Sequence, residues 1–366
     1  MPTTDFESTD YELLAPTESS PSPRYGHAAA TIDDEIYIYG GSDSPSSPTP
    51  ISENGAVHVF DTKTNSWTTL TPASSAHPPN LTFAAAVATT EPHPSSAEVR
   101  ENDPNPKFST ARQDLLPKSD LEPGLNVPEP AALNTYGSLI IYGGIDASGA
   151  PSNAIWTFDI GARLWSQLPS PPLTLAPNPH PNLAIVGNRL YTYAENTTFW
   201  LDLDLHSKAF VQSGTTDLGL SPLAPWSSIV PAEGAPSPDG ERSGAALIPV
   251  STGQGRNYLL LVGGNETGDI WTLQLKPEGM SAASFRDAAS EAVGRHTTEA
   301  TWAEVRYLDS EGEIVQEGQS GRGVGARIGM GVSKVGEYDG GAFVVWGGVG
   351  ADGAIIGDGA LIDVDV

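Results

Sequence analysis

Short hydrophobic runs separated by polar turns follow one another along this chain, and the clearest group lies between Arg24 and Leu70. Its four runs cover residues 27–31, 36–39, 57–60 and 67–70. The first is made of small residues, and the second alternates aliphatic with aromatic side chains, which is typical of half-buried strands. Gly40-Gly41 ends the second run, where the chain needs positive φ or a close backbone approach, and Trp67 opens the fourth. This stretch predicts one four-stranded antiparallel sheet.

The same order of runs recurs to the C-terminus, at an interval of about 50 residues where no insertion intervenes. The further units cover 81–89, 138–142, 155–158 and 165–168; 182–186, 189–193, 199–203 and 226–230; 242–249, 258–262, 269–275 and 301–308; and 327–333, 342–346 and 360–364. For the third unit, 209–212 is the alternative fourth strand, but Trp226-Ser-Ser-Ile-Val-Pro mirrors Trp165-Ser-Gln-Leu-Pro and favours 226–230. Sheets repeated in this way predict an all-β propeller with five recognisable blades. A sixth blade has room only within 91–134 or 205–225, and neither range resembles strands.

The last unit lacks a fourth strand, and the N-terminus contains a segment that resembles one. Tyr11-Glu12-Leu13-Leu14 is similar to the run from Trp67 to Leu70. We therefore expect the N-terminal strand to join the last blade, which would close the ring and remove its free edge.

Two insertions interrupt the predicted single domain of residues 1–366. Residues 91–134 hold eight prolines, eight acidic and four basic residues without periodicity. Such a segment buries too little apolar surface to offset its ordering entropy, so we predict a disordered insertion. Residues 276–299 form the second insertion, in which apolar residues at helical spacing predict a helix over 281–295.

Composition narrows the classes of partner. The net charge of −27 argues against nucleic acid and anionic membranes, which require a cationic surface. No segment approaches the roughly 18 apolar residues of a membrane span, and the acidic N-terminus lacks the apolar core of a secretory signal. The chain has no cysteine, which excludes disulfides and thiolate metal sites. These features predict a cytoplasmic monomer.

The repeated units resemble kelch repeats, which also build the galactose-oxidase-type propeller. The resemblance rests on the Gly-Gly pairs at 40, 143, 263 and 347, on Tyr39, Tyr142 and Trp346 before three of them, on Phe60-Asp61 and Phe158-Asp159, and on the tryptophan of each fourth strand. It implies a propeller whose first strands lie at the axis and whose fourth strands are outermost. It implies no activity, because this fold serves adaptors and enzymes alike.

The sequence lacks the residues that two kinds of kelch enzyme require. Copper-radical galactose oxidases need a cysteine cross-linked to tyrosine, which this chain cannot supply. The Glu-x3-Asp-x3-His spacing of nitrile-specifier proteins is also missing, and the seven histidines show no close metal-ligand spacing. We therefore predict no metal and no cofactor.

Three arginines begin the innermost strands of their units: Arg24 in Arg-Tyr-Gly-His, Arg242 in Arg-Ser-Gly-Ala and Arg327 in Arg-Ile-Gly-Met. Asn80 and Asn178 stand at roughly equivalent places in the second and third units. We expect these five residues to meet at one mouth of the axis and to bind a ligand, because arginine suits carboxylate or phosphate. The alternative is a structural arginine that pairs with a neighbouring blade's carboxylate or carbonyls.

Two functions fit this constellation. In the first, a stand-alone propeller binds an anionic small molecule or an acidic peptide at the arginine-lined mouth, with Tyr25 beside it. In the second, a cofactor-free isomerase, cyclase or lyase acts on a carbonyl- or carboxylate-bearing metabolite. There the arginines would polarise the substrate, and Tyr25 or His27 would move a proton.

Overall fold

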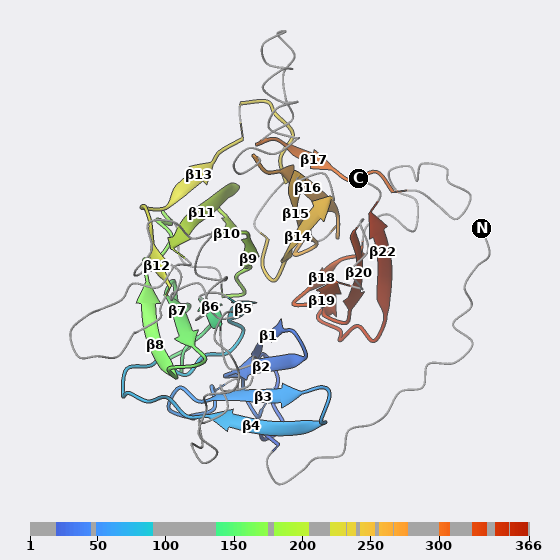
Figure 1. Ribbon diagram of the computed structural model, residues 1–366. Helices are drawn as coiled ribbons and strands as arrows, with labels where there is room; N and C mark the ends of the chain where they lie inside the picture. Colours follow the sequence, from blue (N-terminus) through green and yellow to red (C-terminus); the bar gives the residue numbers. More distant parts are fainter. Residues whose placement is uncertain are drawn as a thin grey trace, which may run out of the picture.

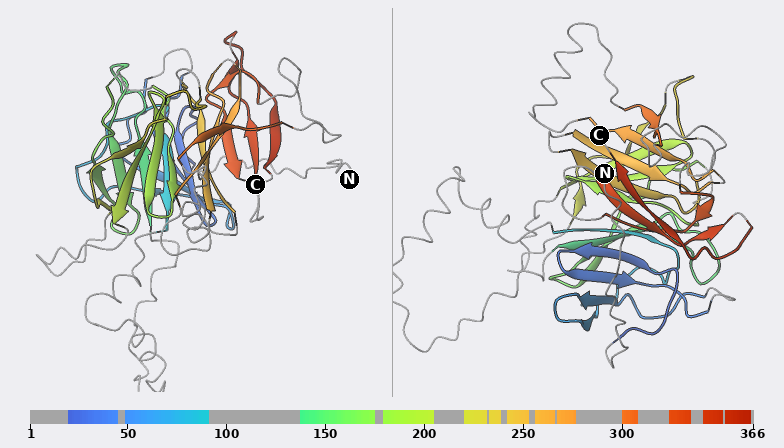
Figure 2. Two further views of the ribbon diagram at one scale, coloured as in Figure 1. Left: turned by 90° about the horizontal axis from the view of Figure 1, so that it is seen from above. Right: turned by 90° about the vertical axis from the view of Figure 1, so that its right-hand side faces the viewer.

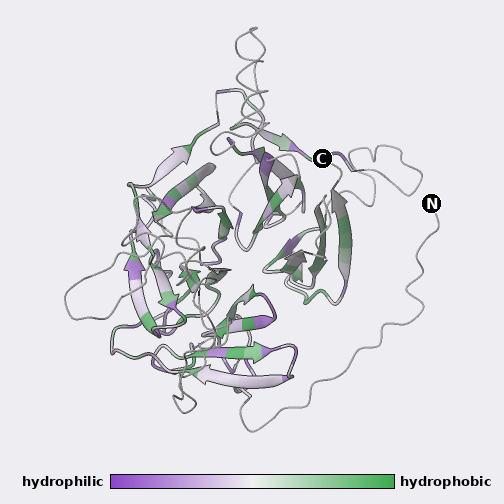
Figure 3. Ribbon diagram, in the orientation of Figure 1, coloured by the Kyte–Doolittle hydropathy of each residue, from purple (hydrophilic) through white to green (hydrophobic). Residues whose placement is uncertain are grey.

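The stretch that opened the sequence pattern forms one antiparallel sheet with its strands in chain order. Its strands are β1 (Ala28–Ile32), β2 (Glu35–Tyr39), β3 (Val57–Asp61) and β4 (Ser66–Leu70). Gly40 and Gly41 both have positive φ, as the predicted turn requires. Figure 3 shows hydrophobic residues along β2 and β3, whereas β4 is nearly neutral in hydropathy. The sheet therefore buries its middle strands and exposes its last.

Four further sheets repeat this order. The second contains β5 (Ala85–Thr89), β6 (Ser138–Tyr142), β7 (Ile155–Asp159) and β8 (Leu164–Leu168). The third contains β9 (Ala184–Val186), β10 (Arg189–Ala194), β11 (Thr197–Asp204), β12 (Ser221–Pro222) and β13 (Ser227–Ile229). The fourth contains β14 (Ala246–Thr252), β15 (Arg256–Val262), β16 (Ile270–Gln274) and β17 (Trp302–Glu304). The fifth contains β19 (Gly331–Lys334), β20 (Gly341–Trp346) and β22 (Gly359–Val364), with β18 (Arg327–Ile328) paired to β21 (Val349–Gly350) at its end.

The sheets stand as blades around a common axis, numbered 1 to 5 here in chain order (Figure 1). The computed structural model describes residues 20–44, 49–90, 137–174, 179–204, 220–231, 233–238, 242–252, 256–265, 267–276, 300–307, 324–334, 341–350 and 352–364. All the elements within these ranges are strands. The first strands lie toward the axis and the fourth strands outside, and Figure 2 shows the blades edge-on. The predicted all-β propeller with five blades is confirmed.

Hydrophobic clusters fill the spaces between neighbouring blades. Between blades 1 and 2, Tyr39 meets Trp165 edge to face with ring centroids 5.3 Å apart. Trp165 also donates from Nε1 to the carbonyl of Gly55, in the loop before β3. The same pairing recurs between blades 3 and 4, where the ring centroids of Tyr193 and Trp302 lie 5.5 Å apart. The outer tryptophan of one blade thus fixes its position against the previous blade.

In blade 3, β13 pairs with β11, which confirms the choice of 226–230 as its fourth strand. Three other predictions fall outside the described residues: the N-terminal strand at 11–14, the disordered insertion at 91–134 and the helix at 281–295. Across the part of the chain that the structure describes, no helix is long and apolar enough to cross a membrane.

Candidate functional site

Strand register places three arginines at the same point of three blades, just before the innermost strand. Ala28, Ala246 and Gly331 pair with the residue that precedes Gly-Gly in their own blades. Arg24, Arg242 and Arg327 precede these residues by the same number of positions. The arginines are therefore equivalent, as their sequence contexts predict, and they lie at the end of the blades where the Gly-Gly turns are.

Arg24 makes a bidentate ion pair with Glu53. Its Nη1 and Nη2 each lie 2.8 Å from a carboxylate oxygen, and Nη1 also donates to the carbonyl of Gly40 at 3.1 Å. Glu53 further contacts Nε2 of His58 at 3.0 Å. The guanidinium is buried in this network, so both its charge and its donors have partners within blade 1.

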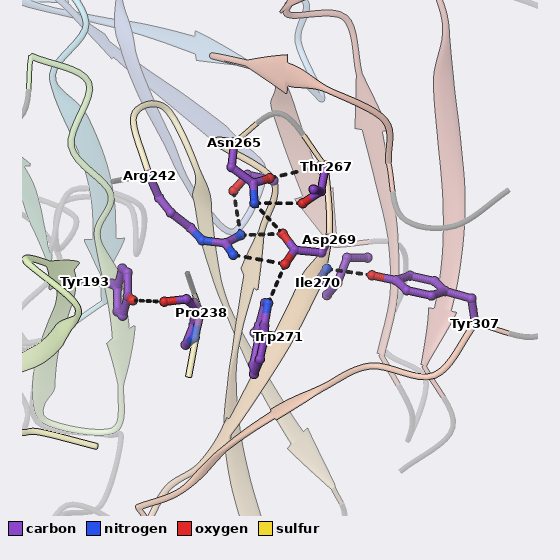
Figure 4. A network of polar contacts seen from close by, with 11 residues as sticks. Tyr193, Pro238, Arg242, Asn265, Thr267, Asp269, Ile270, Trp271 and Tyr307 are labelled. Atoms are coloured by element: carbon purple, nitrogen blue, oxygen red, sulfur yellow. Dashed lines mark hydrogen bonds and ion pairs between the residues drawn. The ribbon is translucent and has the colours of Figure 1, made fainter. Parts of the chain in front are cut away.

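Arg242 is enclosed more completely (Figure 4). Its side chain is fully buried, and Nη1 and Nη2 donate to the two oxygens of Asp269 at 2.7 and 3.0 Å. Nη1 also donates to the carbonyl of Gly263. Asn265 and the indole N–H of Trp271 complete the donors around Asp269, at 2.8 and 2.6 Å. Both Nη atoms of Arg242 thus take part in a charge-assisted network of the kind that fixes a loop.

Arg327 has the same partners in a looser arrangement. Nη1 donates to the carbonyl of Gly347 at 3.3 Å, and Nη2 reaches a single oxygen of Asp358 at 3.1 Å. Asp358 is 77% exposed, whereas Asp269 is 15% exposed. Of the three guanidiniums, this one is held least tightly.

These contacts define an arginine clamp, which we use for an arginine bonded to the first glycine's carbonyl and to a carboxylate before the third strand of its own blade. Both partners therefore come from the same blade and not from a neighbouring one. Blade 2 has neither the arginine nor the carboxylate of the clamp. Leu81 stands at the arginine position, and Ala154, directly before β7, stands where Asp269 stands before β16. Joint loss is what a buried pair requires, since either charge alone would be costly.

The clamps also shift the acidity of their carboxylates. Burial alone raises the pKa of Glu53, but hydrogen bonds from Arg24 and His58 outweigh it and lower the pKa to about 2. For Asp269, burial likewise raises the pKa, and the bonds from Arg242 and Trp271 lower it to about 2. Both groups therefore remain carboxylates throughout the neutral range.

The two predicted asparagines are placed differently. Asn80 is half-buried and lies one residue before Leu81, which is the true register equivalent of Arg24. Backbone hydrogen bonds support the equivalence of Leu81 and the arginines. Gly41, the second glycine of its pair, donates its N–H to the carbonyl of Leu81, and Gly264, the second glycine of the pair in blade 4, donates to the carbonyl of Arg327. Asn178 lies outside the described residues.

Tyr25 and His27 flank Gly26 on the same segment. The Tyr25 hydroxyl donates to the carbonyl of Ser44 at 2.9 Å, and its ring meets Phe83 edge to face. His27 keeps an exposed surface, but partial desolvation of its ring by the surrounding residues, together with the charge of Arg24, lowers its pKa. No hydrogen bond joins Tyr25 to His27 within the described residues.

Residues 23–74 match the family model described as the kelch motif. They contain all of blade 1, which the other four blades repeat. The chain is a kelch-type β-propeller whose first blade carries the motif.

Two other comparisons concern individual proteins. A stretch of 66 residues is 39% identical to the Rho GTPase-activating protein gacHH of Dictyostelium discoideum, over 17% of this kelch propeller and 4% of that protein. The chain thus spans a small part of that relative's length. The solved structure of YjhT aligns over 94% of this chain and 82% of its own, with 14% identity and a TM-score of 0.45.

Sequence reasoning missed a ring of residues around the axis of this kelch propeller. Register aligns five positions, one from each blade: Gly26, Phe83, His180, Gly244 and Gly329. The N–H of Phe83 donates to the Gly26 carbonyl, that of Gly244 to His180, and that of Gly329 to Gly244. Gly26, Gly244 and Gly329 were visible as the third residue of each arginine motif, but nothing marked the other two.

Phe83 is the strained member of this ring. It has a φ of 58°, which glycine adopts freely and a bulky residue rarely does. Its ring lies where a side chain on Gly26 would lie, and its centroid is 4.6 Å from that of His180. Gly26 must therefore remain glycine for Phe83 to pack there.

Blade 5 carries an aliphatic row that blades 1 and 2 lack. Ile328 pairs with Val349, and Val349 bridges to Ile355, so the three side chains lie on one face beside Arg327. All three are exposed, Ile355 by 88%. The corresponding rows are Tyr25, Ser42 and Pro50 in blade 1 and Thr82, Ile145 and Pro151 in blade 2, where Ser42 and Thr82 are buried. We name Ile328, Val349 and Ile355 the blade 5 row.

The described residues contain no group of three or more histidine, aspartate or glutamate side chains arranged to hold a metal ion.

Proposed function

We propose that this kelch propeller is a binding module that holds an anionic ligand at the arginine-bearing end of its axis, through Arg327. Either an anionic small molecule or an acidic peptide has the required chemistry. The blade 5 row favours a peptide, because three exposed aliphatic side chains in line fit an extended chain with apolar residues beside its carboxylates.

One observation carries the proposal. The same clamp is closed in blade 4 and loose in blade 5, where an exposed carboxylate contributes a single bond. A ligand carboxylate that displaces Asp358 would take over the Nη2 donor of Arg327, and a carboxylate is a partner that arginine favours. Arg24 and Arg242 have no such opening, and in this proposal they position the loops around the site.

The enzyme alternative receives no support from the contacts. The hydroxyl of Tyr25 is bonded to a backbone carbonyl, and no described carboxylate contacts His27 to orient it for proton transfer.

Fluorescence anisotropy tests the proposal with a fluorescein-labelled peptide of alternating glutamate and leucine, and with a twin that carries glutamine in place of glutamate. The measurement belongs at physiological ionic strength, where the Debye length is about 8 Å and the net negative charge is screened. We expect the acidic peptide to bind and its twin to bind at least tenfold more weakly, which corresponds to about 1.4 kcal/mol for a charged hydrogen bond.

Arg327→Ala should reduce affinity for the acidic peptide by roughly 10- to 100-fold. The matched control is Arg189→Ala, because Arg189 also pairs with an aspartate, Asp202, but lies on the inner part of blade 3. Equal binding of both peptides, or unchanged binding by Arg327→Ala, would disprove the assignment.

A further inference from the structure

At its arginine end, the axis of this kelch propeller has an aromatic half and a bare half. Blades 1, 2 and 3 contribute Tyr25, Phe83 and His180, and all three side chains are half-buried. Blades 4 and 5 contribute Gly244 and Gly329 at the ring positions, which carry no side chain. The two halves therefore offer a ligand different surfaces.

The three aromatic side chains contact one another in the order of their blades. The ring centroids of Tyr25 and Phe83 are 5.8 Å apart with the ring planes at 68°, and those of Phe83 and His180 are 4.6 Å apart with the planes at 73°. Edge-to-face contacts of this kind are favourable beyond the burial of apolar area. We call Tyr25, Phe83 and His180 the axial aromatic cluster.

Phe83 is held in this cluster at a cost in free energy. Its φ of 58° is strained for a bulky residue, whereas Gly26, Gly244 and Gly329 adopt positive φ freely at three other ring positions. A glycine at position 83 would therefore suit the backbone better. Strained residues cluster at ligand sites, where the surrounding structure holds them in place. The strain thus points to the phenyl ring as a functional group.

The bare half of the axis continues into the blade 5 row. Ile328 belongs to that row and stands directly before Gly329, and its Cγ2 lies 2.8 Å from where a Cβ on Gly244 would be. A Cβ on Gly329 would meet no described atom within 4 Å, so the backbone there faces open space. Arg327 stands two residues before Gly329. A ligand held by Arg327 along the blade 5 row thus comes to the axis over bare backbone.

We infer that the axial aromatic cluster binds an aromatic side chain of the acidic peptide, at the end of the peptide that lies nearest the axis. This inference rests on the proposed function and specifies its ligand further. An aromatic residue suits the place because a fourth ring can continue the edge-to-face series, which a side chain without a π system cannot.

Fluorescence anisotropy tests the inference with the glutamate–leucine peptide and two derivatives, which carry phenylalanine in place of the first or the last leucine. We expect one derivative to bind roughly three- to tenfold more tightly than the parent peptide, which is the size of an aromatic pair. Only one should gain, because one end of the peptide lies at the axis. Cyclohexylalanine at the same position keeps the size without the π system, and it should lose most of this gain.

Phe83→Gly removes the ring and suits a φ of 58°. This variant should bind the parent peptide within about twofold of the unaltered protein and should lose the gain from phenylalanine. The matched control is Trp346→Ala, which removes an aromatic side chain that is 61% exposed and lies outside the ring positions. The control should keep the gain. Phe83→Asn, which also tolerates positive φ, replaces Phe83→Gly if urea titration shows that the glycine variant is unfolded.

Three results would each overturn the inference: no gain with either derivative, an equal gain with cyclohexylalanine, or a gain that persists in Phe83→Gly. In each case, binding of the parent peptide that depends on Arg327 would leave the proposed function intact. If the parent peptide does not bind, or binds without Arg327, the proposed function fails and this inference fails with it.

Discussion

Blades 4 and 5 carry the same arginine clamp in two states. In blade 4, Arg242 has no exposed surface and meets both oxygens of Asp269, which Asn265 and Trp271 also hold. In blade 5, Arg327 reaches one oxygen of Asp358, and three quarters of that aspartate is in solvent. The two clamps share their residue types and their register, so the difference lies in what surrounds them.

Burial of the clamp determines whether its arginine holds a loop or can bind a ligand. A guanidinium whose Nη donors both meet a buried carboxylate stabilises its loop and is closed to ligands. A guanidinium that shares one bond with a solvated carboxylate retains capacity for an outside anion. Three experiments test this difference between the two clamps.

Removing each arginine should give the largest difference. Arg242→Ala leaves the Asp269 carboxylate buried without its counter-charge, so we expect a loss of about 3–5 kcal/mol in the free energy of unfolding. Arg327→Ala removes a pair whose carboxylate is exposed, so no buried charge is left alone, and it should cost at most about 1 kcal/mol. Urea titrations followed by tryptophan fluorescence measure both losses.

The double variant Arg242→Ala with Asp269→Ala provides the control. It should recover part of the loss of the single variant, because no charge remains unpaired. Equal losses for Arg242→Ala and Arg327→Ala would show that the two clamps do not differ.

Acid should weaken the closed clamp. The pKa of Asp269 falls from 3.8 to about 2 on folding, so the carboxylate stabilises the fold above pH 3.8 and loses this contribution as pH falls toward 2. A shift of this size corresponds to roughly 2 kcal/mol. Asp269→Asn should therefore reduce the dependence of stability on pH between 4 and 2, measured by urea titration at each pH. An unchanged slope would argue against the clamp as its source.

Removing the carboxylate of the loose clamp should give the smallest effect on stability. Asp358→Asn deletes a single exposed contact, and we expect a change within about 1 kcal/mol. If Arg327 is the recognition residue, this variant should also bind the glutamate–leucine peptide more tightly, because the competing carboxylate is gone. Weaker binding would mean that Asp358 itself contributes to the ligand site.

Most of the fold was predictable because its signals are local. Ile36 to Tyr39 alternates before a Gly-Gly turn, and β2 follows that run to within one residue. The tryptophan of each fourth strand marked the outermost strands of blades 1, 2 and 4 and resolved the choice in blade 3. The equivalence of three arginines was also visible, since each stands two residues before a glycine.

The partners of those arginines were not predictable, because Glu53, Asp269 and Asp358 lie on loops of different length, far along the chain from their arginines. Phe83 was hidden for a related reason. Glycine signals a left-handed position, whereas a phenylalanine held there by its neighbours leaves no sign in the sequence.

The repeat, the strand order and the turns follow from the sequence alone, because hydrophobic alternation specifies a strand and glycine permits a turn within a few residues. The tertiary structure is needed to tell which arginine clamps are closed and which is loose. That difference depends on burial and on distances between segments that the ring brings together. The energy of an ion pair follows those distances and the surrounding dielectric, not the spacing of the residues along the sequence.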